Sequence, residues 1–314
     1  MGILNNVSLF IVVISVGFLY RRFIDKIEME QEVSDLYLIN NELLKKSTKP
    51  IMWITVPRIK NARKWASFYS RTSNNLNIPY MYLTIKSIIA HNANNFQICI
   101  IDDDSFGNLL PNWDLDLGRM GDPLREKIRY LGMMKLLHQY GGMFVPPSFL
   151  CLTDLEKMYT GICDDNKPFV VETVSYSGNE RFALEPYFIG CRTKQSPIIK
   201  EYVDYLSQLI SRDYTAESIF LNDLSKWCLL QCNDNKMVAV CASKVGTKNI
   251  KGEAVIVEHF FEQQPIDISP QAYGILIPHE QIVKRTALNW FCYVDKNVLA
   301  TMDTELGKYF SRIV

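Results

Sequence analysis

The chain has 314 residues, of which 48% are hydrophobic and 22% charged, so it can bury a sizeable core as one large α/β domain or two smaller ones. Its 34 basic and 34 acidic residues balance, and such a chain has no overall field that would attract nucleic acid. The eight cysteines include no Cys-x-x-Cys pair, which favours free thiols in a reducing compartment over a disulfide framework.

An uncharged segment opens the chain and covers Met1 to Tyr20, about the length that spans a bilayer core. Because no positive residues precede it and no cleavage site follows, we predict an uncleaved transmembrane anchor over residues 1–22, with residues 3–20 in the membrane. Arg21 and Arg22 follow the apolar run, so the positive-inside rule places the large domain on the cytoplasmic side. An ordinary buried helix is the alternative.

A helical stalk is predicted over residues 23–48, which are charged, lack glycine and proline, and carry apolar residues at helical spacing. One α/β domain is predicted to follow, over residues 49–314. It begins with a strand at 50–56, a helix at Pro79–Asn92 and a strand at Phe96–Ile101. This order predicts a parallel sheet with helices on both faces.

Three aspartates, Asp102, Asp103 and Asp104, follow the second strand directly. At the carboxyl end of a parallel strand, carboxylates face the crevice in which open α/β sheets bind ligands. Strand alternation predicts Asp102 and Asp104 on one side and Asp103 on the other, so that one or two of them bind a ribose, a uracil or a metal. The alternative is a solvated turn in which an aspartate caps a helix.

A strongly patterned helix is predicted from Pro123 to Tyr140, where Gly141 tolerates a left-handed cap. The strand-like segment 143–152 follows, and it must break or lie at an edge because Pro146 and Pro147 lack the amide donor. The remaining predicted elements are strands at 168–174 and 186–192, a helix after Ser196, strand-like segments at 254–261 and 273–281, and a polar C-terminal segment.

Three stretches, RYLGMMKLLHQYGGMFV, IIDDDSF and EPYFIGCRTKQSPIIKEYVDYL, together resemble the glycosyltransferases with the sugar-binding DXD region (family 32-like) and the related capsular polysaccharide synthesis proteins. The resemblance covers residues 51–206 in motif order. In that family, a helix ending in aromatic-Gly-Gly leads into a strand that supplies Asp-x-Asp. The resemblance implies a GT-A fold, with a Rossmann-like mixed sheet flanked by helices. It also implies a nucleotide-sugar donor, a glycan or protein acceptor, and usually a manganese or magnesium ion.

The chain departs from the family at the metal-binding positions. Aligned on the two glycines, the family aspartates fall on Pro146 and Ser148, and a proline offers a hard divalent cation no ligand. The resemblance therefore leaves a divalent metal doubtful. Met133 occupies the place of the family's helical arginine, for which Arg125 or Arg129 is the substitute, although a surface basic residue is the commoner reading of either.

The candidate site is therefore built around the strand ends, and no catalytic residue is identified. Donor-binding candidates are Asp102, Asp103, Asp104, Arg125, Arg129, Gly141, Gly142 and Ser148. Weak candidates for a metal ligand are Asp104, His259 and His279, the histidines being otherwise structural. Tryptophans near the crevice that could stack on a sugar or base, or else belong to the core, are Trp53, Trp65 and Trp113. We expect the aspartate run and the Gly141-Gly142 turn to converge on one crevice, and their placement on opposite sides of the sheet would rule out the family.

Two functions follow from these observations. The first is a membrane-anchored glycosyltransferase that transfers a sugar from a nucleotide-sugar donor to a glycan or protein acceptor. The second is an inactive GT-A-fold pseudo-enzyme that serves as a membrane-tethered structural or recruitment module. The aspartate run and the helix-Gly-Gly frame favour the first, whereas Pro146 and Pro147 favour the second.

Overall fold

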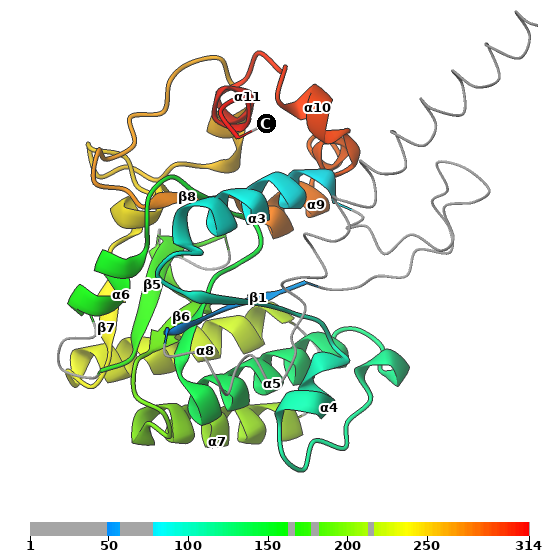
Figure 1. Ribbon diagram of the computed structural model, residues 1–314, viewed down its shortest axis with the longest axis vertical. Coiled ribbons are helices and arrows are strands. Elements are labelled where there is room, and N and C mark those ends of the chain that lie inside the picture. The colour runs from blue at the N-terminus through cyan, green and yellow to red at the C-terminus, as the bar shows by residue number, and fades with distance from the viewer. Residues whose placement is uncertain (1–48, 57–77, 163–166, 177–181, 213–216, 314) are drawn as a thin grey trace, which may run out of the picture. The chain divides into compact units, whose positions relative to one another are not determined.

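The computed structural model describes residues 49–56, 78–162, 167–176, 182–212 and 217–313 (Figure 1). All of them belong to the compact unit Asn40–Val314. The predicted anchor and stalk, as well as Trp65, lie outside the described ranges. Within those ranges, no helix has the length and apolar character needed to cross a membrane.

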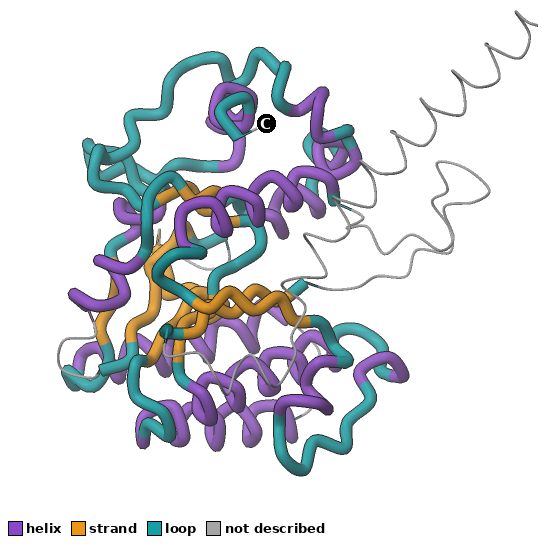
Figure 2. Tube along the Cα trace, in the orientation of Figure 1, coloured by secondary structure: helices purple, strands orange, loops and turns teal. Residues whose placement is uncertain are grey.

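A six-stranded mixed sheet lies at the centre of the described domain, with the strand order β2-β1-β3-β6-β5-β7 (Figures 1 and 2). β1 runs parallel to β2 and β3, and β5 runs parallel to β7, while β6 is antiparallel to both of its neighbours. The strands are β1 (Ile51–Thr55), β2 (Gln97–Ile101), β3 (Gly142–Phe144), β5 (Phe169–Val174), β6 (Phe182–Cys191) and β7 (Val238–Val240).

The expectation of a parallel sheet is therefore wrong at β6, the strand of this sheet that runs antiparallel to its neighbours, whereas the mixed sheet implied by the resemblance is present. Only residues 175–181 join β5 to β6. A parallel pair needs a crossover of a dozen or more residues, so a connection of this length returns the chain antiparallel.

Helices cover both faces of the sheet (Figures 1 and 2). On one face lie α5 (Leu124–Tyr140), α7 (Pro197–Ser211) and α8 (Glu217–Asn233), and on the other lies α3 (Pro79–Asn92). The predicted helices α3, α5 and α7 are confirmed, because each carries apolar residues at helical spacing that become buried. Elements that the sequence reading missed include α8 and β7, and the shorter pieces α4 (Ser105–Leu109), η2 (Leu117–Arg119), α6 (Glu156–Ile162) and η3 (Ala242–Val245).

The strand-like segment 143–152 is broken, as its two prolines predict. β3 ends at Phe144 in the large sheet, and β4 (Phe149–Cys151) pairs antiparallel with β8 (Gly274–Leu276) in a separate two-stranded sheet. The amide of Val145 still donates to Trp53 O at 3.0 Å and extends the ladder by one residue. The chain then leaves the large sheet where the amide donors are missing.

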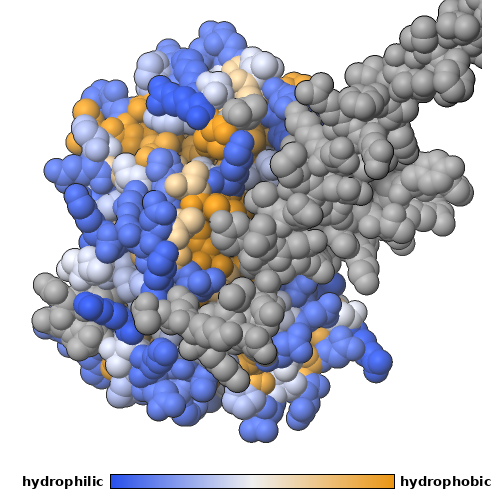
Figure 3. Space-filling model, viewed as in Figure 1, coloured by the Kyte–Doolittle hydropathy of each residue, from blue (hydrophilic) through white to orange (hydrophobic). Residues whose placement is uncertain are grey.

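The C-terminal segment builds a second core on the β4–β8 sheet. Residues from α3 pack there with Leu150, Ile275, Phe291 and Phe310, all of which are buried. The strand expected at 254–261 is wrong, because Val257–Phe261 forms the 3-10 helix η4 and no strand is formed in this segment. Further short elements are η4 (Val257–Phe261), α9 (His279–Lys284), η5 (Asn289–Tyr293), α10 (Lys296–Leu299) and α11 (Glu305–Phe310). Figure 3 shows hydrophobic residues in the middle of one face, between more hydrophilic residues above and below.

Candidate functional site

The carboxyl ends of β1, β2 and β3 define the edge of the sheet that could hold a ligand. The chain leaves β1 to form β2 on one side and later returns to form β3 on the other, so the strand order reverses at β1. In open α/β sheets, ligands bind outside the carboxyl ends of the strands at such a switch point. Two described segments meet this edge, Asp102–Asp104 after β2 and Pro146–Ser148 after β3.

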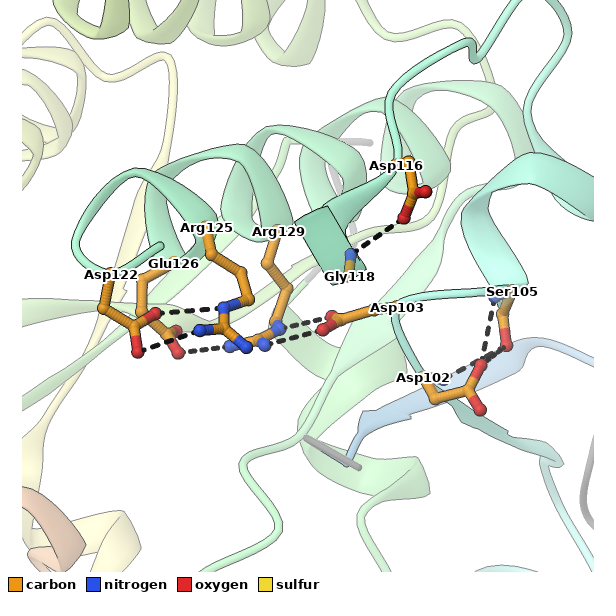
Figure 4. Close-up of polar contacts among 9 residues, drawn as sticks. All are labelled: Asp102, Asp103, Ser105, Asp116, Gly118, Asp122, Arg125, Glu126 and Arg129. Atoms are coloured by element: carbon orange, nitrogen blue, oxygen red, sulfur yellow. Dashed lines mark hydrogen bonds and ion pairs between the residues drawn. The ribbon is translucent and has the colours of Figure 1, made fainter. Parts of the chain in front are cut away.

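Asp102 closes the turn that follows β2. Its Oδ1 accepts hydrogen bonds from the amide of Ser105 at 3.0 Å and from the hydroxyl of Ser105 at 2.6 Å (Figure 4). The Asp102 side chain is buried, with 7% of the residue exposed. Asp102 therefore holds the turn that leads into α4, although the N-cap position of that helix is Asp104, whose side chain makes no capping hydrogen bond.

Asp103 forms a two-pronged ion pair with Arg129 on α5. Its carboxylate oxygens lie 2.6 and 2.8 Å from Nε and Nη2 of Arg129, and Glu126 binds the remaining side of the guanidinium (Figure 4). The Arg129 side chain is only 8% exposed. Burial alone would lower the pKa of Arg129, but the hydrogen bonds and charges of Asp103 and Glu126 raise it, so the guanidinium stays charged. The guanidinium of Arg129 therefore binds carboxylates of the protein itself.

Asp104 differs from its two neighbours because its side chain is exposed. The chain has already left the strand here, since the amide of Ser105 donates to Asp102 O at 3.1 Å. Strand alternation therefore does not apply, and the prediction that Asp102 and Asp104 share one side is wrong. Of the three aspartates, Asp104 is the one whose carboxylate faces solvent next to the edge.

Arg125 lies in the first turn of α5, four positions before Arg129. Its guanidinium bonds Asp122 at 3.2 and 3.3 Å, and its side chain is 33% exposed (Figure 4). An exposed ion pair of this kind contributes little to stability and exchanges readily with other anions. α5 leads directly into the amino end of β3, so its own N-terminus points to the carboxyl edge. Met133, which stands in the family's arginine position, is buried.

The Pro146–Ser148 loop is fixed between α3 and β8. Thr84 donates its hydroxyl to Pro147 O at 2.5 Å, and the amide of Ile277 donates to Ser148 O at 3.2 Å. Ser148 is 6% exposed. Its hydroxyl is therefore not at the surface, and Ser148 offers no exposed group with which to bind a donor as expected.

Gly141 and Gly142 lie at the opposite ends of the strands from the aspartates. Both have positive φ angles, 69° and 96°, and a Cβ on Gly142 would lie 2.2 Å from Ile51 O at the start of β1. The glycines stop α5 and let β3 pass against β1. The prediction that they converge with Asp102–Asp104 on one crevice is wrong, and this separation weakens the resemblance.

The candidate metal ligands are spread over separate elements. Nδ1 of His279 lies 2.8 Å from the hydroxyl of Tyr80, and burial lowers the pKa of His279. His259 lies within η4, and Asp104 follows β2. In the described part of the chain, no three His, Cys, Asp or Glu residues are grouped so that they could hold a metal ion. Together with Pro146, these residues do not fit a divalent cation, which prefers several charged oxygens.

The two described tryptophans of the predicted crevice lie in packed surroundings. Trp53 has no exposed surface, and its Nε1 donates to Gly141 O at 3.0 Å. The ring centroid of Trp113 lies 5.4 Å from that of Phe106, and Nζ of Lys135 lies over the Trp113 ring, 5.5 Å from its centroid. A stacking role for Trp53 is therefore wrong, since a buried indole presents no face to a ligand.

One acidic residue near this edge was missed by the sequence reading. Glu185 lies on β6, directly before the segment 186–192 that was predicted as a strand. Burial raises the pKa of Glu185 to about 7. The signal in the sequence was the Glu-Pro pair, because a proline inside a strand marks a bulge or an edge, where a side chain can be re-aimed.

Neither the models of known protein families nor the curated proteins include a match to this chain. The fold and the site define a mixed α/β domain with an acidic turn at a strand-order reversal.

Proposed function

We propose that the chain is a GT-A-like glycosyltransferase that binds a nucleotide sugar at the carboxyl edge of β1, β2 and β3 and passes the sugar to a glycan or protein. The observation that carries this proposal is the reversal of strand order at β1, with the aspartate turn on one side and the start of α5 on the other. The sequence resemblance to the DXD glycosyltransferases is a second support, which the separation of Gly141 and Gly142 from the aspartate run weakens.

The residues at this edge offer groups for both halves of a nucleotide diphosphate. The exposed carboxylate of Asp104 can accept hydrogen bonds from ribose hydroxyls. The guanidinium of Arg125 can leave Asp122 to bind the diphosphate, and the N-terminus of α5 adds its own positive end. Catalysis then depends on positioning and on stabilising the charge of the leaving diphosphate.

A manganese or magnesium ion, if bound, would neutralise part of the diphosphate charge. The described residues supply no cluster for such an ion. The proposal therefore assigns the diphosphate to Arg125 and to backbone amides, and it assigns no step to a metal.

A second candidate is the catalytically inactive scaffold, and specific contacts favour it. Asp102 bonds Ser105 and Asp103 bonds Arg129, so two of the three aspartates serve the fold. Pro146 and buried Ser148 stand where the family binds metal. The scaffold would keep the sheet and the aspartate turn without any affinity for a donor.

The two candidates are separated by titrating the full-length chain with UDP-glucose, UDP-galactose and GDP-mannose, with and without manganese, in a calorimeter. We expect one of them to bind and Asp104→Asn to weaken that binding by about tenfold or more, the value of a lost charged hydrogen bond. Asp234→Asn, in an exposed turn after α8, is the matched control and should change nothing. If the parent binds none of the nucleotide sugars, the scaffold function takes the place of the transferase.

A further inference from the structure

A bulge interrupts the pairing of β6 with β5 beside the proposed donor site. Val170 lies opposite Ile189, yet the next residue, Val171, lies opposite Glu185. β6 therefore accommodates the additional residues 186–188 between two neighbouring positions of β5. Bulges of this kind turn side chains in new directions and are frequent next to active sites.

Aromatic residues hold this bulge from both faces of the sheet. Tyr130 on α5 donates its hydroxyl to Pro186 O at 2.8 Å, and its ring lies 4.9 Å from that of Tyr187. On the other face, the ring of Phe188 packs 5.1 Å from Phe149 on β4. Pro186 has no amide hydrogen, so the bulge breaks no hydrogen bond that this residue could donate to a neighbouring strand. The distortion is therefore fixed by the fold.

The strand register places Glu185 toward the carboxyl edge of the sheet. Gly190 on β6 is paired with a residue of β3 on one side and with a residue of β5 on the other, so that one row of paired residues crosses the three strands. Glu185 pairs with Val171, which lies two residues beyond that row along β5. β3 and β5 both run antiparallel to β6, so the same step along β3 leads to Val145, the residue before Pro146. Glu185 thus lies at the carboxyl edge, where the switch point also lies.

The carboxyl group of Glu185 is held in a defined and partly buried position. Its Oε1 accepts a hydrogen bond from the amide of Tyr187 at 3.2 Å, across the bulge, and the residue keeps some exposure. Burial raises the pKa of Glu185 to about 7, the Tyr187 amide lowers it, and the charge of Glu280 on α9 raises it further. The phenol of Tyr130 also lies close enough for the charge of Glu185 to raise its pKa. A carboxyl group that titrates near neutrality suits proton transfer.

We propose that Glu185 is the general base of the sugar transfer, an inference that rests on the nucleotide-sugar function proposed above. Its carboxylate takes the proton from the attacking hydroxyl of the acceptor, or from water, while that oxygen forms a bond to the anomeric carbon of the donor. The bond between the anomeric carbon and the phosphate oxygen breaks, and its electron pair leaves with the nucleoside diphosphate. The proton on Glu185 then passes to solvent.

The experiment compares donor binding with donor hydrolysis in the full-length chain, because water can replace the unidentified acceptor. UDP-glucose, UDP-galactose and GDP-mannose are titrated by calorimetry, and the released nucleoside diphosphate is measured over a pH series. We expect Glu185→Gln to bind the donor within about twofold of the parent but to hydrolyse it about 10²–10⁴-fold more slowly. Glu201→Gln, an exposed carboxylate on α7, is the matched control and should leave both quantities unchanged.

The pH series provides a readout that a purely structural role would not affect. The parent rate should fall as the pH drops through about 7, because the base becomes protonated. Glu280→Gln removes a charge that raises the pKa of Glu185, so it should move this fall to lower pH. Glu185→Asp keeps a carboxylate and should retain more activity than Glu185→Gln, which also guards against a variant that misfolds.

Each contrary outcome has a distinct meaning. If Glu185→Gln binds and hydrolyses the donor as the parent does, the base is another group and the transferase function stands. If Glu185→Gln loses binding while circular dichroism shows a native fold, Glu185 holds the donor and the assignment as base is overturned. If the parent binds none of the three nucleotide sugars, the proposed function fails and the inference fails with it.

Discussion

At the scale of single residues, Arg129 shows how a group expected to bind a ligand can belong to the fold. It lies between Asp103 and Glu126 with 8% of its side chain exposed. Arg129→Met would leave two carboxylates without their counter-charge, and we expect it to lower the free energy of unfolding by about 2–3 kcal/mol, less than for a fully buried pair because Asp103 is partly exposed. Urea unfolding measures the change.

The control for this prediction lies one turn earlier on the same helix. Arg125→Met removes an exposed pair with Asp122 and should cost at most about 1 kcal/mol. Equal losses in the two variants would show that the Asp103–Arg129 pair does not stabilise the fold, and Arg129 would again be available for a ligand.

The titration of Glu185 gives a second prediction at this scale. Burial raises the pKa of Glu185 from its usual 4.5 to about 7, so between these values the native protein holds a proton that the unfolded chain has released. The native state is therefore destabilised as the pH rises toward 7, and it is not affected below the unfolded pKa. The Glu185→Gln variant does not lose stability in this way, because the glutamine side chain does not titrate. From pH 5 to pH 8 the variant should gain about 1–2 kcal/mol on the parent in denaturant unfolding, and a constant difference would contradict the shift.

At the scale of elements, the sequence correctly predicted the helices and strands whose local residue pattern agrees with their surroundings in the fold. α3 and α5 follow from helical spacing, β1 and β2 from short β-rich runs, and the break between β3 and β4 from two prolines without amide donors. The 3-10 helix η4 was misread because a short apolar run fits strand and helix equally well. The bulge in β6 depends on Tyr130 from a distant helix, and no local pattern reveals such a partner.

The turn between α5 and β3 allows a test at this scale. Gly142→Ala would place a Cβ 2.2 Å from Ile51 O at a φ of 96°, so we expect a loss of at least about 3 kcal/mol from strain and overpacking together. Gly161→Ala in α6 meets nothing within 4 Å and should be neutral or stabilising by up to about 1 kcal/mol. Thermal unfolding compares the two variants. A tolerated alanine at Gly142 would show that β3 does not approach β1 this closely.

At the scale of the whole molecule, the sheet order was beyond the reach of the sequence, and so was the grouping of the site. The aspartate run was correctly placed at a strand end, but its three side chains divide between a hydrogen bond within the turn, an ion pair and solvent. That division depends on Ser105 and on Arg129, which lies far along the chain. Trp53 and Ser148 were also misjudged, because both are buried in the fold. Their burial depends on elements that lie further along the chain.

The N-terminal segment carries the last prediction. Met1–Tyr20 is uncharged and long enough to span a bilayer core, and Arg21 and Arg22 follow it, so the positive-inside rule predicts that the large domain lies on the cytoplasmic side. In sealed vesicles of known orientation, added protease should digest the domain when the cytoplasmic face is outside and spare it when that face is inside. Detergent should abolish the protection, which serves as the control. Digestion in the opposite orientation would reverse the topology. Release of the full-length chain by high salt or alkaline carbonate would show that Met1–Tyr20 does not anchor the protein, because neither treatment extracts a spanning helix from lipid.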